Sequence, residues 1–256
     1  MRKMGKSAGV ILTLLLCGAG LAAAEDKVLP LPAEDQQKLD SLLGPGVVGQ
    51  ALPCKPIQDA SVYFPLHDRA MTFKVTSGKN AGKIQNLAVG QVERPGGKQA
   101  WRFQLSPSLA GFIRLTPDGT LTMPAVSDAG EGLVVFATPG NPFLPQGMQP
   151  GETRSYSQAV SVNYIDDPME RDYSGSLKGT YTYLGTYRVT VPAGTFDAML
   201  LRTKCEGKVG PAHTHNTAYN LFAPGVGMVA MIMQEDVKAF WIFNIDSTTG
   251  KVLMTK

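Results

Sequence analysis

Short runs of β-branched and aromatic residues, separated by Gly, Pro, Asn and Asp, fill the chain from about Ala60 onward. The runs lie too close together for helices between them, so they cannot be joined by the crossovers that parallel strands need. The pattern predicts antiparallel β structure, with strands at Met71–Thr76, Ile84–Val92, Ala100–Leu105, Phe112–Thr116, Leu121–Pro124, Leu133–Ala137, Ala159–Tyr164, Leu177–Leu184, Tyr187–Val191, Ala198–Cys205, Thr217–Phe222, Gly227–Met233, Ala239–Ile245 and Lys251–Met254.

Turn and helix signals mark the ends of these runs. Asp118-Gly119 is a typical hairpin turn between two predicted strands. A short helix is predicted at Pro32–Leu43, where Pro comes early, acidic residues fill the first turn and Leu recurs at helical spacing. Gly44-Pro45-Gly46 then ends it.

A stretch rich in Pro and Gly, residues 138–151, interrupts the strand pattern. This stretch could be a linker between two halves of the chain, but a disulfide between Cys54 and Cys205, which lie on either side of it, would hold the halves together. We therefore expect one β-rich domain over residues 25–256, with two halves joined near 138–151 as the alternative. The predicted fold is all-β: an antiparallel β-sandwich or an open, curved half-barrel, with a short N-terminal helix.

The first 24 residues have the features of an export signal. Arg2, Lys3 and Lys6 precede an apolar run, and Ala22-Ala23-Ala24 supplies a small-residue cleavage site. This predicts a periplasmic or secreted protein cut near Ala24. Lipid anchoring through Cys17 is not favoured, because Leu16 is bulky where lipoprotein signals carry a small residue.

Net charge argues against one class of partner. Of the 24 Lys and Arg residues, three lie in the signal, and the remaining 21 equal the 21 Asp and Glu residues. Nucleic-acid binding needs clustered cations that displace counterions, so no nucleic-acid partner is expected. No later stretch reaches the roughly 18 apolar residues of a membrane-spanning helix.

Two cysteines remain after the signal, Cys54 and Cys205. In an exported protein an isolated pair predicts a disulfide, since two thiols alone cannot complete a tetrahedral metal shell. Two separately buried thiols are the alternative.

Residues for catalysis or metal binding are few. His213 and His215 would share one face of a strand and are the weak metal candidates, but two ligands are too few for a site. No catalytic or cofactor motif is present in the mature region, so we expect no cofactor and place a hydrolase last among the functions.

Methionine and aromatic residues in the last strands could line an apolar pocket or simply form core. This favours an envelope protein that binds or carries an apolar small molecule or lipid. The alternative is a structural or assembly scaffold with an envelope protein as partner. The candidate lining residues are Met199, Phe222, Met228, Met231, Met233, Phe240 and Trp241. By strict alternation, Met228 would lie on the opposite face from Met231 and Met233.

Two turn motifs are distinctive. Val191–Phe196 reads V-P-A-G-T-F and Ala223–Gly227 reads A-P-G-V-G, while Tyr63–Leu66 reads Y-F-P-L. The combination resembles a group of uncharacterised bacterial periplasmic or envelope β-sheet proteins, mainly over the last third of the chain. The resemblance implies a periplasmic β-sheet or half-barrel fold, and it brings no reaction or site residues.

Overall fold

The computed structural model describes residues 27–93, 99–239 and 243–255. Twelve antiparallel strands, β3 to β14, form a closed ring, and β1 and β2 extend from β10 outside it. The ring closes because β9 pairs with β10. The antiparallel all-β prediction is therefore confirmed, but the predicted sandwich or open half-barrel is wrong.

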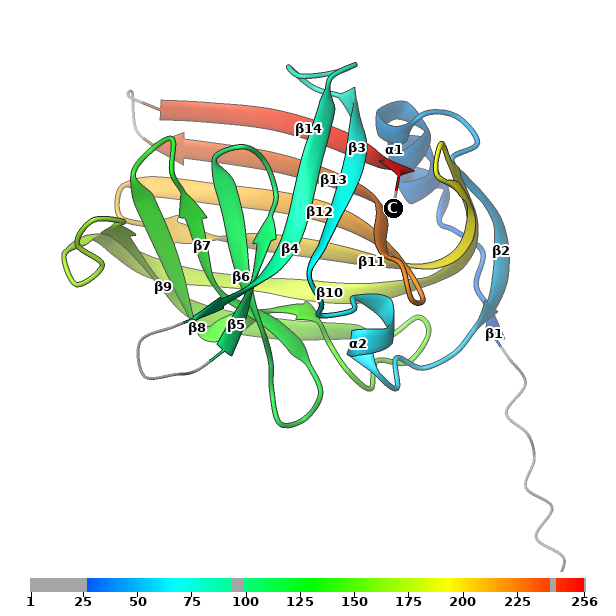
Figure 1. Ribbon diagram of the computed structural model, residues 1–256, viewed down its shortest axis with the longest axis horizontal. Coiled ribbons are helices and arrows are strands. Elements are labelled where there is room, and N and C mark those ends of the chain that lie inside the picture. Colours follow the sequence, from blue (N-terminus) through cyan, green and yellow to red (C-terminus); the bar gives the residue numbers. More distant parts are fainter. Residues whose placement is uncertain (1–26, 94–98, 240–242, 256) are drawn as a thin grey trace, which may run out of the picture.

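The strands of the ring differ in length. In Figure 1 the long strands β10 to β14 form one wall of the barrel, and the shorter strands β4 to β7 face them. The elements are β1 (Lys27–Val28), α1 (Ala33–Leu43), β2 (Val48–Cys54), α2 (Ala60–Tyr63), β3 (Arg69–Ser77), β4 (Ile84–Glu93), β5 (Gln99–Gln104), β6 (Leu109–Leu115), β7 (Leu121–Asp128), β8 (Leu133–Leu144), β9 (Thr153–Tyr164), β10 (Arg171–Val191), β11 (Gly194–Val209), β12 (Ala212–Ala223), β13 (Gly227–Ala239) and β14 (Phe243–Thr255).

Strand β10 explains why the sheet closes. Its first half, up to Thr182, pairs with β9 and completes the ring, whereas Thr186 to Val189 pair with β2 instead. A register shift between Tyr183 and Gly185 separates the two halves. Gly185 has a φ of 146°, a conformation that L side chains rarely adopt. The two strands predicted here are thus one strand with a bulge.

Most other local predictions are confirmed. The helix at Ala33–Leu43 begins after Pro32 and ends at Gly44. The Asp118-Gly119 turn joins β6 to β7, with Gly119 at φ 84°. The predicted strand Ala239–Ile245 is wrong, because β13 ends at Ala239 and β14 begins at Phe243. Residues 138–151 are not a bare connection either, since β8 continues to Leu144.

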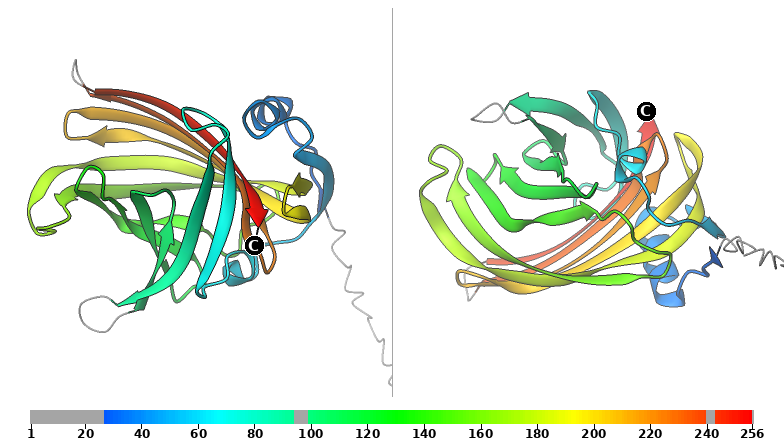
Figure 2. Two further views of the ribbon diagram at one scale, coloured as in Figure 1. Left: turned by 45° about the horizontal axis from the view of Figure 1, so that its top comes forward. Right: turned by 90° about the horizontal axis from the view of Figure 1, so that it is seen from below.

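Helix α1 lies against the outer face of the barrel wall (Figure 2). Asp35, 1% exposed, accepts two hydrogen bonds of 2.8 Å from Nη1 of Arg202 on β11, one on each carboxylate oxygen. The hydroxyl of Tyr219 on β12 donates to the same carboxylate at 2.7 Å. Because the buried carboxylate is paired and hydrogen-bonded, this network fixes the helix on the wall.

The predicted Cys54–Cys205 disulfide is wrong, since both cysteines are free. Cys54 ends β2 outside the ring, where its thiol donates to the carbonyl of Leu52 at 3.3 Å and accepts from the amide of Thr186 at 3.4 Å. Cys205 lies on β11 and faces the interior of the barrel. The two thiols therefore lie in different environments, each with its own partners.

No helix in the described ranges is long and apolar enough to cross a membrane. The predicted export signal and Cys17 lie outside the residues that the structure describes.

Candidate functional site

The barrel interior contains a cavity of about 310 Å³, called the interior cavity below. Its lining comes from β6 to β13 and from Leu105, which follows β5, so closure of the ring creates it. Most of the lining is apolar, including Leu105, Leu109, Met123, Val126, Val135, Phe143, Leu177, Met228, Met231 and Met233.

Three methionines of β13 form one side of the cavity, the methionine wall: Met228, Met231 and Met233. Strict alternation would place Met228 on the other face, and that expectation is wrong. Phe222 pairs with Met228 and Leu221 with Ala230, so Val229 is an extra residue in β13. This bulge reverses the alternation and turns Met228 inward.

Aromatic rings fill the barrel at one end of the cavity. Phe64 directly follows α2, and its ring centroid lies 5.2 Å from that of Phe103 on β5, 5.0 Å from that of Phe143 on β8 and 6.3 Å from that of Phe222 on β12. All three pairs meet edge to face, a favourable geometry for aromatic rings. We call these four residues the aromatic plug. Phe143 also lines the cavity, so the plug is its floor.

The lining changes along the wall away from the plug. The Phe222–Met228 pair at the plug is apolar, and the pairs Asn220–Met231 and Ala218–Met233 follow further along. Beyond them lies a row of polar pairs, called the rim row: Tyr156, Cys205, Asn216 and Glu235, from β9, β11, β12 and β13. The rim row is therefore a polar band in the cavity wall. The aromatic plug lies on one side of this band, and apolar residues such as Leu177 and Val160 line the cavity on the other.

The rim row is largely engaged in hydrogen bonds. Tyr156 shares one with the thiol of Cys205, and Glu235 accepts one from the hydroxyl of Ser247 at 3.1 Å. Burial raises the pKa of the Tyr156 hydroxyl and the pKa of the Cys205 thiol, so both groups stay protonated at neutral pH. The neighbouring Tyr181 donates to Asn141 Oδ1, and burial raises its pKa as well.

Gln158 on β9 is the exception. Its side chain lines the cavity and is only 7% exposed, yet its Oε1 has no hydrogen-bond partner among the described residues. It lies two residues beyond Tyr156 on the same face of β9, at the rim side of the cavity. An unpaired buried amide oxygen of this kind lowers the free energy of unfolding by roughly 1–3 kcal/mol. Among the cavity residues, Gln158 would therefore gain most from a hydrogen-bond donor.

Lys251 on β14 also points into the barrel. It pairs with Met231 of the methionine wall, is 5% exposed, and donates to the carbonyl of Leu105 at 2.6 Å. It forms no ion pair with any described carboxylate, and burial lowers its pKa to about 8. Sequence reasoning missed both Gln158 and Lys251. A signal was present in the sequence: each of the two is a polar residue spaced two positions from an apolar residue, which places both on the same face of the strand.

The remaining lining candidates lie elsewhere. Phe222 belongs to the aromatic plug, and Met199 pairs with it and is fully buried. Phe240 and Trp241 lie outside the described residues.

His213 and His215 share the outer face of β12, in a surface hollow of about 430 Å³. His215 Nδ1 lies 3.8 Å from Glu206 Oε2, while His213 pairs with Lys208 on one side and Lys238 on the other. No group of three or more candidate metal ligands occurs among the described residues. The flanking ammonium groups oppose a cation at His213.

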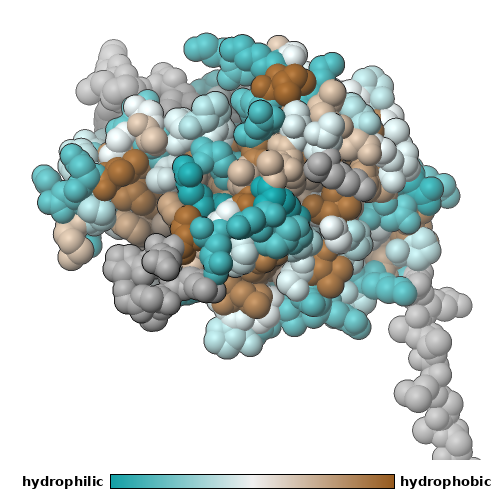
Figure 3. Space-filling model, viewed as in Figure 1, coloured by the Kyte–Doolittle hydropathy of each residue, from teal (hydrophilic) through white to brown (hydrophobic). Residues whose placement is uncertain are grey.

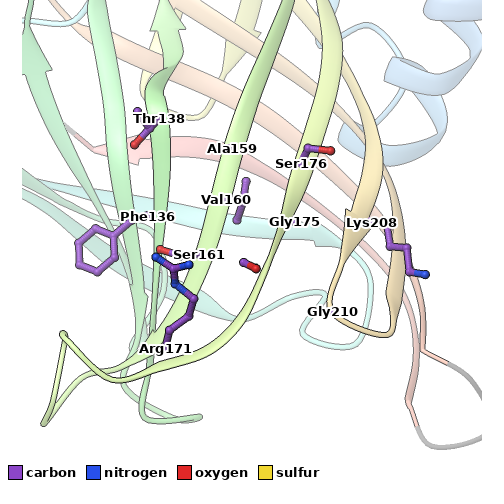
Figure 4. A pocket seen from close by; sticks show the side chains of 11 residues that line it. Phe136, Thr138, Ala159, Val160, Ser161, Arg171, Gly175, Ser176, Lys208 and Gly210 are labelled. Atoms are coloured by element: carbon purple, nitrogen blue, oxygen red, sulfur yellow. The ribbon is translucent and has the colours of Figure 1, made fainter.

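A further hollow of about 690 Å³ lies on the outer face of β8 to β10 (Figure 4). Its lining includes the small Ala159 and Ser161 of β9 together with the larger Phe136, Arg171 and Lys208, and Val160 borders both this hollow and the interior cavity. On the face shown in Figure 3, hydrophobic residues lie in separate patches between hydrophilic ones. Of these hollows, only the interior cavity combines an apolar lining with a buried, unpaired polar group.

The chain matches no protein-family model and no curated protein by sequence. Membership in the envelope group that Val191–Phe196 and Ala223–Gly227 resemble therefore stays a prediction. Similar solved structures include a proposed lipoprotein from Parabacteroides distasonis ATCC 8503, with 12% identity over 80% of this chain and 99% of that chain and a TM-score of 0.34. A proposed exported protein with a YmcC-like fold from Bacteroides fragilis NCTC 9343 has 13% identity over 79% and 97% of the two chains and a TM-score of 0.37.

The hypothetical lipoprotein YmcC from Escherichia coli K12 has 10% identity over 79% of this chain and 90% of that chain, with a TM-score of 0.38. At these scores the likeness is loose and assigns no function to this chain.

Proposed function

We propose that this protein binds an apolar small molecule inside its barrel and acts as a carrier or binding protein. The observation that carries the proposal is the interior cavity, bounded by the methionine wall and the floor of the aromatic plug. Ligand sites are typically concave, mostly apolar and furnished with a few polar groups, and small closed barrels can hold one ligand. Methionine suits such a lining because its unbranched, polarizable side chain adapts to different shapes.

The cavity volume limits the ligand. A water molecule's share of liquid volume is about 30 Å³, so 310 Å³ accommodates about ten non-hydrogen atoms. This matches a medium-length acyl chain or a pair of fused rings. The ligand can be longer if part of it extends past the rim row.

Uptake of 1-aminonaphthalene, an uncharged fused-ring dye whose size is close to that of the cavity and whose fluorescence depends on the polarity of its surroundings, tests the proposal. Wild-type protein should bind the dye. Met231→Asp and Met233→Asp should abolish uptake, because each places a carboxylate in the apolar lining. Met169→Asp is the matched control, since Met169 is 91% exposed in the loop between β9 and β10.

Circular dichroism must show that the Asp variants remain folded. If the wild type takes up no dye, or if Met231→Asp and Met233→Asp bind it as well as Met169→Asp does, the cavity is not a ligand site. The scaffold alternative would then replace the carrier proposal.

We also propose that the protein is exported and cut near Ala24, on the pattern of residues 1–24. The intact mass of exported protein should correspond to a chain that begins near Glu25. A chain that begins with an acylated Cys17 would replace this proposal with membrane anchoring.

A further inference from the structure

From Gln158 and the rim row we infer that the ligand is an uncharged amphiphile: an apolar chain that ends in a hydroxyl or amide group. The chain lies toward the aromatic plug, and the polar end donates a hydrogen bond to Gln158. The inference rests on the proposed function and names the chemical class that the cavity selects.

The first argument is the unpaired amide. Gln158 is more than nine-tenths buried, lines the cavity, and has an acceptor oxygen without a partner in the described part of the chain. A ligand that donates a hydrogen bond removes the cost of this buried acceptor, whereas an alkane leaves it in place. The cavity therefore favours a ligand with a hydrogen-bond donor, because only such a ligand pairs with the buried oxygen of Gln158.

The second argument is the position of Gln158. Phe143 forms the floor of the cavity, and Gln158 lies on the far side of the rim row, two residues beyond Tyr156 on β9. An amphiphile whose polar group reaches Gln158 can therefore lay its chain along the methionine wall toward the plug.

The third argument concerns charge. The described lining of the cavity includes one ionisable carboxyl, Glu235 in the rim row, and no Lys, Arg or His. A carboxylate head at the rim would lie near that carboxyl and would meet neutral amide and hydroxyl groups otherwise. Burying it there without a cation is costly, so an uncharged head fits better.

Lys251 defines the competing arrangement. Its ammonium group lies deeper, beside Met231, and is held by the carbonyl of Leu105. A fatty acid could reach it only with its head inverted toward the apolar part of the cavity. The inverted fatty acid is thus a distinct outcome of the test.

Displacement of 1-aminonaphthalene by ligands of similar length tests the inference on the full protein. The ligands are undecane, decanol, decanamide and decanoate. Decanol or decanamide should displace the dye about three- to tenfold more effectively than undecane, the value of one hydrogen bond. Comparing decanol with decanamide shows which donor Gln158 prefers.

The key variant is Gln158→Leu, which has a similar size and no acceptor. It should still take up the dye, and its preference for decanol over undecane should fall to less than about twofold. Gln91→Leu, at an exposed position of β4, is the matched control and should keep the wild-type preference for decanol over undecane.

Other outcomes overturn the inference. Equal displacement by all uncharged ligands would mean that water already satisfies Gln158, and the carrier proposal would survive. Strongest displacement by decanoate, lost in Lys251→Met, would establish the inverted fatty acid instead. No dye uptake by the wild type would overturn the carrier proposal and this inference together.

Discussion

The two ends of the barrel interior are filled in different ways. At one end four phenylalanines meet edge to face with centroids 5.0 to 6.3 Å apart, and Phe64, Phe103 and Phe222 are fully buried. Beyond them the methionine wall borders a cavity of about 310 Å³ whose lining is mostly apolar. Rigid rings from four elements complete the packing at the plug, whereas slender side chains leave space further along. The comparison teaches that rings fill one end of the interior, whereas the other end keeps the space that the carrier proposal requires.

The largest expected effect is at the plug. Phe64→Ala should lower the free energy of unfolding by about 4 kcal/mol, because it removes the ring that bridges three strands and leaves a cavity. Urea unfolding measures the change. The control is Phe136→Ala, a partly exposed ring on β8. Equal losses for both variants would show that the plug has no special role.

The cavity side should contain a group that opposes folding at neutral pH. Burial lowers the pKa of Lys251 from 10.5 to about 8, so between these pH values the unfolded chain binds more protons than the folded chain. Stability of the wild type should therefore rise with pH across this window. Lys251→Met should raise the free energy of unfolding by up to about 3 kcal/mol at pH 7, and the gain should shrink toward pH 10.

Lys74→Met, on the exposed face of β3, is the control for this titration. If the stability gain of Lys251→Met is the same at pH 7 and pH 10, Lys251 is not a buried cation in solution.

Truncation of the methionine wall should cost less than truncation of the plug. Met231→Ala is expected to lose about 2 kcal/mol, the low end for buried methionine, because one side of Met231 already faces the cavity. Met148→Ala should lose more, since Met148 is 0% exposed and lines no cavity described here. A larger loss for Met231→Ala would mean that the interior is filled by protein at this level.

The smallest effect has the opposite sign. Gln158→Leu should raise the free energy of unfolding by about 1 kcal/mol, because it removes a buried acceptor without a partner. Thermal unfolding of the ligand-free protein measures it. A destabilised variant would indicate that a bound water holds Gln158 in the native protein.

Local patterns predicted the strands and turns well, because hydrophobic alternation and turn residues act over a few positions. The closed ring was not predictable in the same way. Closure depends on β9 pairing with β10 and on the bulge at Gly185, which lets one strand serve two partners. Neither pairing leaves a periodic signal in the sequence.

The candidate site shows the same limit. Met231 and Met233 were assigned to one face correctly, but Met228 was placed on the other face because one bulge at Val229 reverses the alternation. The disulfide expectation failed because Cys54 lies outside the ring and Cys205 lines the cavity. Gln158 and Lys251 share a strand face with apolar residues, but only the closed ring shows that this face is the interior.

The most direct test of the interior cavity is a crystal structure of the protein under xenon pressure. Xenon enters apolar protein cavities, so we predict xenon peaks between the methionine wall and Phe143. An interior without xenon, in which side chains or a chain of ordered waters fill the space beside Met231, would contradict the account.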